Sequence, residues 1–279
     1  MTRWKAFVCS LLVTLFCLLP LYLLTVGSRL FGTRAVDESA AGVPVLTASP
    51  QDALPLLLVL REPGPAAVLL RLDAWQGRAE CLVLPQDTLL PDGTGRITLE
   101  ECFAAAGPLQ LRTVLEKALG AEFERYLCLS GEALAAAFAE YAPMLHWHEL
   151  GSLKDLALLR RLAFNGGEGA IASTTAAALI RRCDGGSADT AALRAALYRA
   201  FLTEGLPTLS GPVTALLRSE EALLTDITAV DIYGIERLLT LLAAAPPTVE
   251  CAVPEGISAR DGWQLTDAGW QSMKALLAG

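Results

Sequence analysis

The run Leu84-Pro85-Gln86-Asp87-Thr88 marks the place where an apolar, strand-like stretch ends and a polar turn begins. Residues 78–84 predict a strand, and residues 90–95, Leu-Pro-Asp-Gly-Thr-Gly, predict a turn. A chain that leaves a strand for such a turn places its polar side chains at the edge of a sheet, where binding sites are commonly built. We therefore expect Gln86 and Asp87 to line a ligand site.

Strands and helices alternate along most of the remaining chain. Residues 54–60 and 66–72 are continuous apolar runs, which suit strands buried on both faces of a sheet. Pro108 predicts the start of a helix that Gly120 ends. Further strands are predicted at 124–129 and 248–253, and further helices at 130–141, 174–182, 188–202, 212–223, 233–244 and from Leu265-Thr266-Asp267 onward. This order predicts an α/β fold, a three-layer α-β-α sandwich with a mixed central sheet.

The composition is that of a well-packed globular protein. Apolar residues make up 53% of the 279 residues and charged residues only 19%, which argues against disorder. The formal net charge of −8 disfavours a nucleic-acid partner, because phosphate neutralisation needs a basic surface.

Residues 6–26 are almost wholly apolar and uncharged, and their length matches a helix that spans a bilayer. Arg3 and Lys5 precede this run, which favours a cytoplasmic N-terminus. We expect a single-pass protein of the cell membrane. Its predicted parts are a cytoplasmic segment at 1–5, an anchor at 6–26, a stalk at 27–52 and an extracytoplasmic domain at 53–279. A signal peptide cleaved after Gly27 is the alternative.

The cysteines and histidines predict neither a disulfide framework nor a metal site. Five of the seven cysteines lie outside the anchor, with no Cys-x-x-Cys spacing, so Cys81 and Cys128 are expected to be free and buried. His146 and His148 would share one face of a strand, but no third ligand is identifiable. Thr190 has no histidine nearby that would indicate a hydrolase triad.

The order of elements and their turn residues resembles the LytR-CpsA-Psr family of bacterial envelope proteins, over most of residues 54–278. The family's Pro-Arg-Asp-Thr motif is similar to Pro85-Gln86-Asp87-Thr88, and its Lys-Ile-Asn motif to Arg96-Ile97-Thr98. Its Gly-Gly-Pro helix start is similar to Ala106-Gly107-Pro108, and its Tyr-x-Arg-x-Arg stretch to Ala178-Leu-Ile-Arg-Arg182. The resemblance implies a membrane-anchored α/β protein that transfers glycopolymers from a polyprenyl-pyrophosphate carrier onto peptidoglycan.

The chain departs from the family at several charged positions. The family's Asp-x-Arg falls on Val59-Leu60-Arg61, and its Arg-Ser-Asp-Thr on Pro63-Gly64-Pro65-Ala66 or on a deletion. A later arginine-rich segment leaves only Arg194 in place. In the family these arginines clamp the pyrophosphate and the aspartates help to hold Mg²⁺. Losing a bidentate guanidinium, as at Gln86, can cost several powers of ten in the rate of phosphoryl transfer.

The resemblance implies two sets of site residues. The pyrophosphate-binding set is Arg61, Gln86, Arg96, Arg181, Arg182 and Arg194, and the catalytic set is Asp87 and Arg96. Mg²⁺ is expected only in an active enzyme, because Asp87 alone is too few ligands for a metal site. The alternative for the arginines is an ordinary place on the surface or in salt bridges. Within the alanine- and leucine-rich second half, a helix such as residues 191–202 would either face a core or wall a tunnel for a polyprenyl tail.

The leading hypothesis is a divergent family member that binds a polyprenyl-phosphate-linked glycopolymer or another envelope lipid, with impaired or lost transferase activity. The first alternative is an active glycopolymer-to-peptidoglycan phosphotransferase. The second is a non-catalytic scaffold or regulator of the envelope.

Overall fold

The computed structural model describes residues 46–61, 65–93, 95–142, 144–146, 170–172, 175–176, 178–179, 188–209 and 224–279. Residues Thr47–Gly279 form one compact unit. Among the described residues, no helix is both long enough and apolar enough to cross a membrane. The predicted anchor at 6–26 lies outside the described residues.

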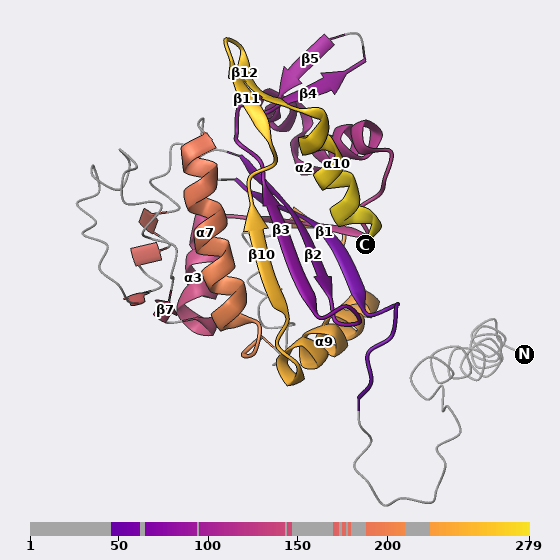
Figure 1. Cartoon of the computed structure of the whole chain (residues 1–279), viewed down its shortest axis with the longest axis vertical. Helices are drawn as coiled ribbons and strands as arrows, with labels where there is room; N and C mark the ends of the chain where they lie inside the picture. The colour runs from indigo at the N-terminus through magenta and orange to yellow at the C-terminus, as the bar shows by residue number, and fades with distance from the viewer. Residues whose placement is uncertain are drawn as a thin grey trace, which may run out of the picture. The chain divides into compact units, whose positions relative to one another are not determined.

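A six-stranded mixed sheet forms the centre of this unit (Figure 1). Its strands are β1 (Ala53–Leu60), β2 (Ala66–Asp73), β3 (Arg78–Val83), β6 (Arg125–Leu129), β9 (Leu224–Thr225) and β10 (Thr248–Ala252), in the order β10-β3-β2-β1-β6-β9. Strand β6 is parallel to β1 and β10 is parallel to β3, whereas β2 is antiparallel to both β1 and β3. The carboxyl ends of β1, β3, β6 and β10 therefore lie together along one end of the sheet. We call this row of strand ends the edge that carries the candidate site.

Helices cover both faces of the sheet, and each face has its own apolar core. The helices are α2 (Leu99–Leu119), α3 (Gly131–Tyr141), α7 (Ala188–Gly205), α9 (Ala229–Ala244) and α10 (Asp267–Ala278). Helices α3, α7 and α9 share a core with Leu56 and Val68 of the sheet. Helices α2 and α10 share the other core with Leu57 and Leu69. Adjacent residues of one strand thus enter opposite cores, which explains why the strands are continuous apolar runs.

Short two-stranded antiparallel sheets complete the described part of the unit. They are β4 (Leu89–Asp92) with β5 (Gly95–Thr98), β7 (Met144–His146) with β8 (Ala170–Ala172), and β11 (Gly256–Ala259) with β12 (Gly262–Leu265). The first of these falls where the sequence predicted only a turn. It uses Gly93, whose φ of 56° lies in the left-handed region that glycine adopts without strain.

The mixed α/β fold with a central mixed sheet is confirmed, and two helices begin earlier than predicted. Helix α2 begins at Leu99, because Thr98 and Glu101 form a capping box. Its backbone leaves helical geometry at Ala106 and Gly107, so Pro108 opens the second part of a kinked helix. Helix α9 begins at Ala229 after a second capping box. The helix predicted at 212–223 and most of the one at 174–182 lie outside the described residues.

The prediction about the cysteines is wrong in one respect. Cys81 and Cys251 form a disulfide between the neighbouring parallel strands β3 and β10, with their Cα atoms 4.5 Å apart. The two residues are 170 positions apart in the sequence, and only the pairing of β10 with β3 brings them together. Cys102 and Cys128 are free and buried, as predicted for Cys128.

Candidate functional site

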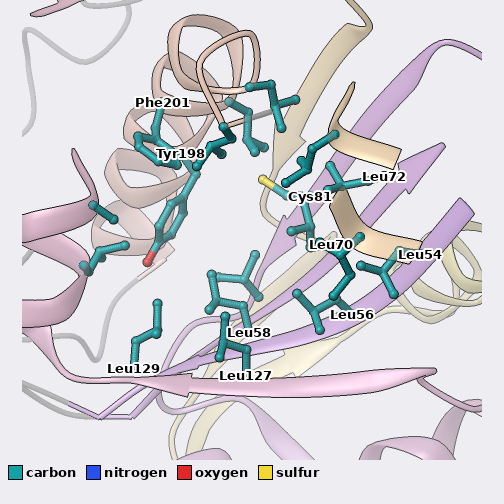
Figure 2. Close-up of a pocket in the computed structure, with 18 of the residues that line it drawn as sticks. Leu54, Leu56, Leu58, Leu70, Leu72, Cys81, Leu127, Leu129, Tyr198 and Phe201 are labelled. Carbon is teal, nitrogen blue, oxygen red and sulfur yellow. The ribbon is translucent and has the colours of Figure 1, made fainter. Parts of the chain in front are cut away.

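An apolar cavity of about 160 Å³ lies between the sheet and the helices α3, α7 and α9 (Figure 2). Leucines of β1, β2 and β6 form its floor, and Tyr198 and Phe201 reach into it from α7. The remaining walls come from α3, α9 and the turn after α7. An apolar cavity of this size, about that of an engineered 150 Å³ cavity that takes up benzene, stays dry and accepts apolar molecules.

The cavity follows one face of the sheet and extends toward the edge that the sequence predicted as a ligand site. Leu58 and Leu129, near the carboxyl ends of β1 and β6, line it. Arg61 follows β1 directly, and its backbone N–H donates to the Leu129 carbonyl at 2.9 Å. Gln86 and Asp87 follow β3 at the same edge, because β3 is parallel to β1. The structure thus brings Arg61, Gln86 and Asp87 to one edge.

The turn at 85–88 is held firmly by its own backbone and by α2. The buried Thr88 hydroxyl donates to the Pro85 carbonyl at 2.6 Å. The Thr88 carbonyl accepts from the first amide of α2, that of Leu99, at 2.9 Å. The Asp87 carbonyl accepts from Trp263 at 2.9 Å, and a Cβ at Gly262 would collide with this carbonyl. These contacts fix the backbone positions of Gln86 and Asp87.

Burial raises the pKa of the Asp87 carboxyl above its ordinary value, and a hydrogen bond from its own backbone amide offsets part of this effect. Its Oδ1 atom is buried, and no hydrogen-bond partner lies within reach of it among the described residues. Gln86 is buried, with 7% of its surface exposed. Its uncharged amide stands where the family has an arginine. Carboxylates with raised pKa values in clefts are candidates for functional sites.

The donors at this edge do not fit a resident Mg²⁺. Mg²⁺ prefers an octahedral set of hard oxygen ligands, of which proteins usually supply at least one or two carboxylates together with substrate phosphates. The described residues contain no cluster of three or more acidic, histidine or cysteine side chains. The residue Val59, which stands in place of the family's first aspartate, is fully buried in an apolar core. We therefore derive no step through a metal.

Two of the predicted arginines are buried, although neither lines the cavity, and Arg61 lies near Cys128 of the core on the other face of the sheet. The Nε atom of Arg61 is buried, and its positive charge opposes the effect of burial on the Cys128 thiol, whose pKa is raised to about 11. Arg194 is only 1% exposed and lies on α7, one helical turn before Tyr198. Fully buried arginines are rare, because burying a charge is costly without partners.

Arg96, the remaining described arginine of the predicted set, lines another hollow. Arg96 lies on β5 and is exposed to a different hollow, formed with β12 and α10 beside the other core. Arg181 and Arg182 lie outside the described residues, as does His148. His146 lies 3.5 Å from Glu204 in an exposed pair. Thr190 is buried near the start of α7.

Sequence reasoning missed Ser130, Tyr198 and Phe201 as residues of this region. Ser130 follows β6 at the same edge of the sheet, and its hydroxyl accepts from the Ala133 amide at 3.1 Å, at the start of α3. Tyr198 and Phe201 are three positions apart on α7, a spacing that places both side chains on one helix face. That spacing could have indicated a wall, but not whether a core or a cavity lay behind it.

The mixed sheet with helices on both faces is the fold of solved LytR-CpsA-Psr proteins. Among solved structures, the chain is similar to "TagT bound to LIIa-WTA", with a TM-score of 0.61 and 14% identity over 88% of this chain and 100% of that one. It is also similar to B. subtilis TagV, with a TM-score of 0.59 and 11% identity over 82% and 97% of the two chains. A transcriptional regulator from Enterococcus faecalis matches with a TM-score of 0.60 and 14% identity over 83% and 89%.

No family model and no curated protein matches the sequence. The similarity therefore lies in the fold.

Proposed function

We propose that this protein binds a polyprenyl-phosphate-linked glycopolymer of the bacterial envelope and that its transferase activity is impaired or lost. The observation that carries the proposal is the apolar cavity, which extends to Leu58 and Leu129, near the sheet edge that holds Arg61, Gln86 and Asp87. Such a site suits a ligand with an apolar tail and a polar phosphate head. The structural neighbour TagT is described as bound to LIIa-WTA, which supports a glycopolymer as the head group.

In this proposal the isoprenoid tail occupies the cavity, and the phosphate lies at the sheet edge. Arg61 and the buried Arg194 supply positive charge, and the Gln86 amide donates a neutral hydrogen bond. Arg181 and Arg182 remain predicted members of this set. We leave Arg96 out of it, because Arg96 lies on β5 and lines a hollow formed with β12 and α10.

Impaired transfer follows from the charge that the site lacks. Phosphoryl transfer depends on neutralising charge as it develops in the transition state. Gln86 supplies no charge, and Val59 supplies no carboxylate to a metal. A site of this composition holds a phosphate better than it transfers one.

An active phosphotransferase is the alternative that Asp87 favours. There an acceptor hydroxyl oxygen would attack the phosphorus next to the glycopolymer, the bond from that phosphorus to the bridging oxygen would break, and polyprenyl phosphate would leave. Asp87 would take the hydroxyl proton, and its raised pKa suits such a role. Mg²⁺ would then have to be brought largely by the substrate phosphates.

The disulfide supports an extracytoplasmic position for the domain, with residues 6–26 as the proposed membrane anchor. Disulfides persist in oxidising compartments and are rare in the cytosol of most organisms. Peptidoglycan is a second proposed partner only if transfer is retained.

The test uses the full-length chain and farnesyl pyrophosphate, a short isoprenoid with the same head. Ala137 lines the cavity, so Ala137→Trp fills it, whereas Ala105→Trp adds the same bulk to an exposed position of α2. We expect saturable binding that Ala137→Trp abolishes and Ala105→Trp leaves unchanged. A transfer assay with a polyprenyl-pyrophosphate-linked glycopolymer, peptidoglycan and Mg²⁺ then separates the alternatives. Binding without transfer supports the proposal, transfer supports the active enzyme, and no binding leaves the scaffold.

A further inference from the structure

A second hollow, of about 360 Å³, lies between the β4–β5 hairpin, β12 and α10. We call it the α10 hollow. Its polar lining consists of Arg96, Gln264, Asp267, Trp270, Gln271 and Lys274. Its volume falls in the range of small-molecule binding sites. We propose that the α10 hollow binds an anionic sugar, with the sugar ring on Trp270 and its acidic group between Arg96 and Lys274.

Among the described residues, the charged side chains of the α10 hollow have no partner that stabilises the fold. Within the described part of the chain, none of Arg96, Lys274 or Asp267 takes part in a salt bridge or a side-chain hydrogen bond. This contrasts with Arg71, Arg112, Arg125 and Arg237, each of which binds a carboxylate at 3.1 Å or less. Two cations that line one hollow without a structural role leave their charge available to an anion.

The aromatic ring and the amides point to a sugar rather than to a bare anion. Trp270 is half-buried and packs against the core beneath α10, so one side of its side chain is held in place. Asp267, Trp270, Gln271 and Lys274 follow the three- and four-residue spacing that places side chains on one face of a helix. Gln264 approaches from β12. Amide and carboxylate groups hydrogen-bond sugar hydroxyls, while an aromatic face packs on the apolar face of a ring.

This site is separate from the apolar cavity and does not depend on the proposed function. The two lie beside opposite cores, and they share no lining residue. The α10 hollow would bind a sugar whether or not a lipid occupies the cavity. The experiment that tests this proposal therefore uses no lipid.

The experiment is isothermal titration calorimetry of the full-length chain with N-acetylglucosamine 1-phosphate. We expect a dissociation constant on the order of 1 mM, typical of a few exposed contacts. Lys274→Gln and Arg96→Gln should each weaken binding about tenfold. Trp270→Leu keeps apolar packing but removes the aromatic face, and it should weaken binding similarly. Arg260→Gln, an exposed arginine at the β11–β12 turn, and Trp75→Ala, a tryptophan that is 57% exposed elsewhere, are the matched controls and should bind as the wild type does.

Further ligands separate the sources of the negative charge and the parts of the site. Glucuronic acid carries a carboxylate in place of the phosphate, and equal binding would widen the ligand class to acidic sugars in general. Neutral N-acetylglucosamine should bind at least about tenfold more weakly, and inorganic phosphate should be insensitive to Trp270→Leu. The proposal is overturned if neither acidic sugar binds, if the neutral sugar binds equally well, or if the Arg260→Gln control weakens binding as much as Lys274→Gln.

Discussion

Cys81 and Cys251 are register partners in neighbouring parallel strands, and their disulfide joins the wall of the apolar cavity to the last strand of the sheet. Cys81 lines the cavity from β3, and Cys251 lies on β10 at the edge of the sheet. The bond closes a loop of 170 residues, so it restricts the unfolded chain over most of the domain.

We predict that Cys251→Ser lowers the free energy of unfolding by about 2–4 kcal/mol. Urea denaturation of the full-length chain, with and without reductant, measures the effect. Reductant should destabilise the wild type by a similar amount and leave Cys251→Ser unchanged. If reductant destabilised both proteins equally, the effect would not come from this bond.

The second prediction concerns the amino-terminal side of the sheet. Arg125 donates to both carboxylate oxygens of Asp231, at 2.8 and 2.6 Å, and Asp231 also closes the capping box of α9 with Thr228. The hydrogen bond from Arg125 is the main cause that holds the pKa of Asp231 well below its ordinary value of 3.8. The pair therefore stabilises the fold above about pH 4, and this stability is lost as the pH falls below that value.

Asp231→Asn should cost about 1–2 kcal/mol at neutral pH, because it removes both the ion pair and part of the cap. It should also make the loss of stability below pH 4 less steep. Chemical denaturation between pH 2.5 and about 7 tests both effects. Asp92→Asn, at an exposed position of β4, serves as the control and should follow the wild-type profile.

The pKa shift of Asp87 has the opposite sign to that of Asp231, so its effect on the pH dependence of stability is also opposite. Because burial raises its pKa, ionised Asp87 is less stable in the folded chain, and its contribution to stability declines as the pH rises above about 4. Asp87→Asn should therefore raise stability at pH 7, by up to about 1 kcal/mol after allowance for solvent screening, and have no effect well below pH 4. A lower melting temperature at pH 7 would show that the carboxylate supports the fold.

The sequence predicted the sheet better than the site. Strands β1 and β2 were found because strands buried on both faces are continuous apolar runs, a signal that needs no knowledge of partners. The pairing of β10 with β3 joins residues 170 positions apart, so the disulfide could not be read from cysteine spacing.

The positions of the candidate residues were predicted where they depend on the ends of strands, but not where they depend on packing. Gln86 and Asp87 follow a strand, and their place at the sheet edge was predicted. Arg96 was grouped with them because a motif aligned it, but the β4–β5 hairpin carries it to another hollow. The Tyr198 spacing fits a core or a cavity equally well, and only the packing of α7 decides between them.

Arg194 gives a prediction about the lipid head. It is buried one helical turn from Tyr198, so we expect it to contribute to phosphate binding and not to tail binding. Arg194→Lys keeps the charge but loses the planar, bidentate guanidinium. It should weaken farnesyl phosphate binding about tenfold or more and leave farnesol binding unchanged. Equal losses for both ligands would mean that the substitution has only deformed the cavity.

Gln86→Arg tests whether the missing charge limits the site. The Gln86 side chain is 7% exposed, so an arginine there brings a charge into a confined position and should lower stability by about 1–3 kcal/mol without ligand. Farnesyl pyrophosphate should then bind more tightly and recover the lost stability, because its phosphates pair with the new guanidinium. Gln86→Met has similar bulk without charge, and it should neither tighten binding nor respond more strongly to the ligand than the wild type. If Gln86→Arg binds pyrophosphate no better than Gln86→Met, then this edge of the sheet does not hold the phosphate, and the neutral amide is not what limits the chemistry.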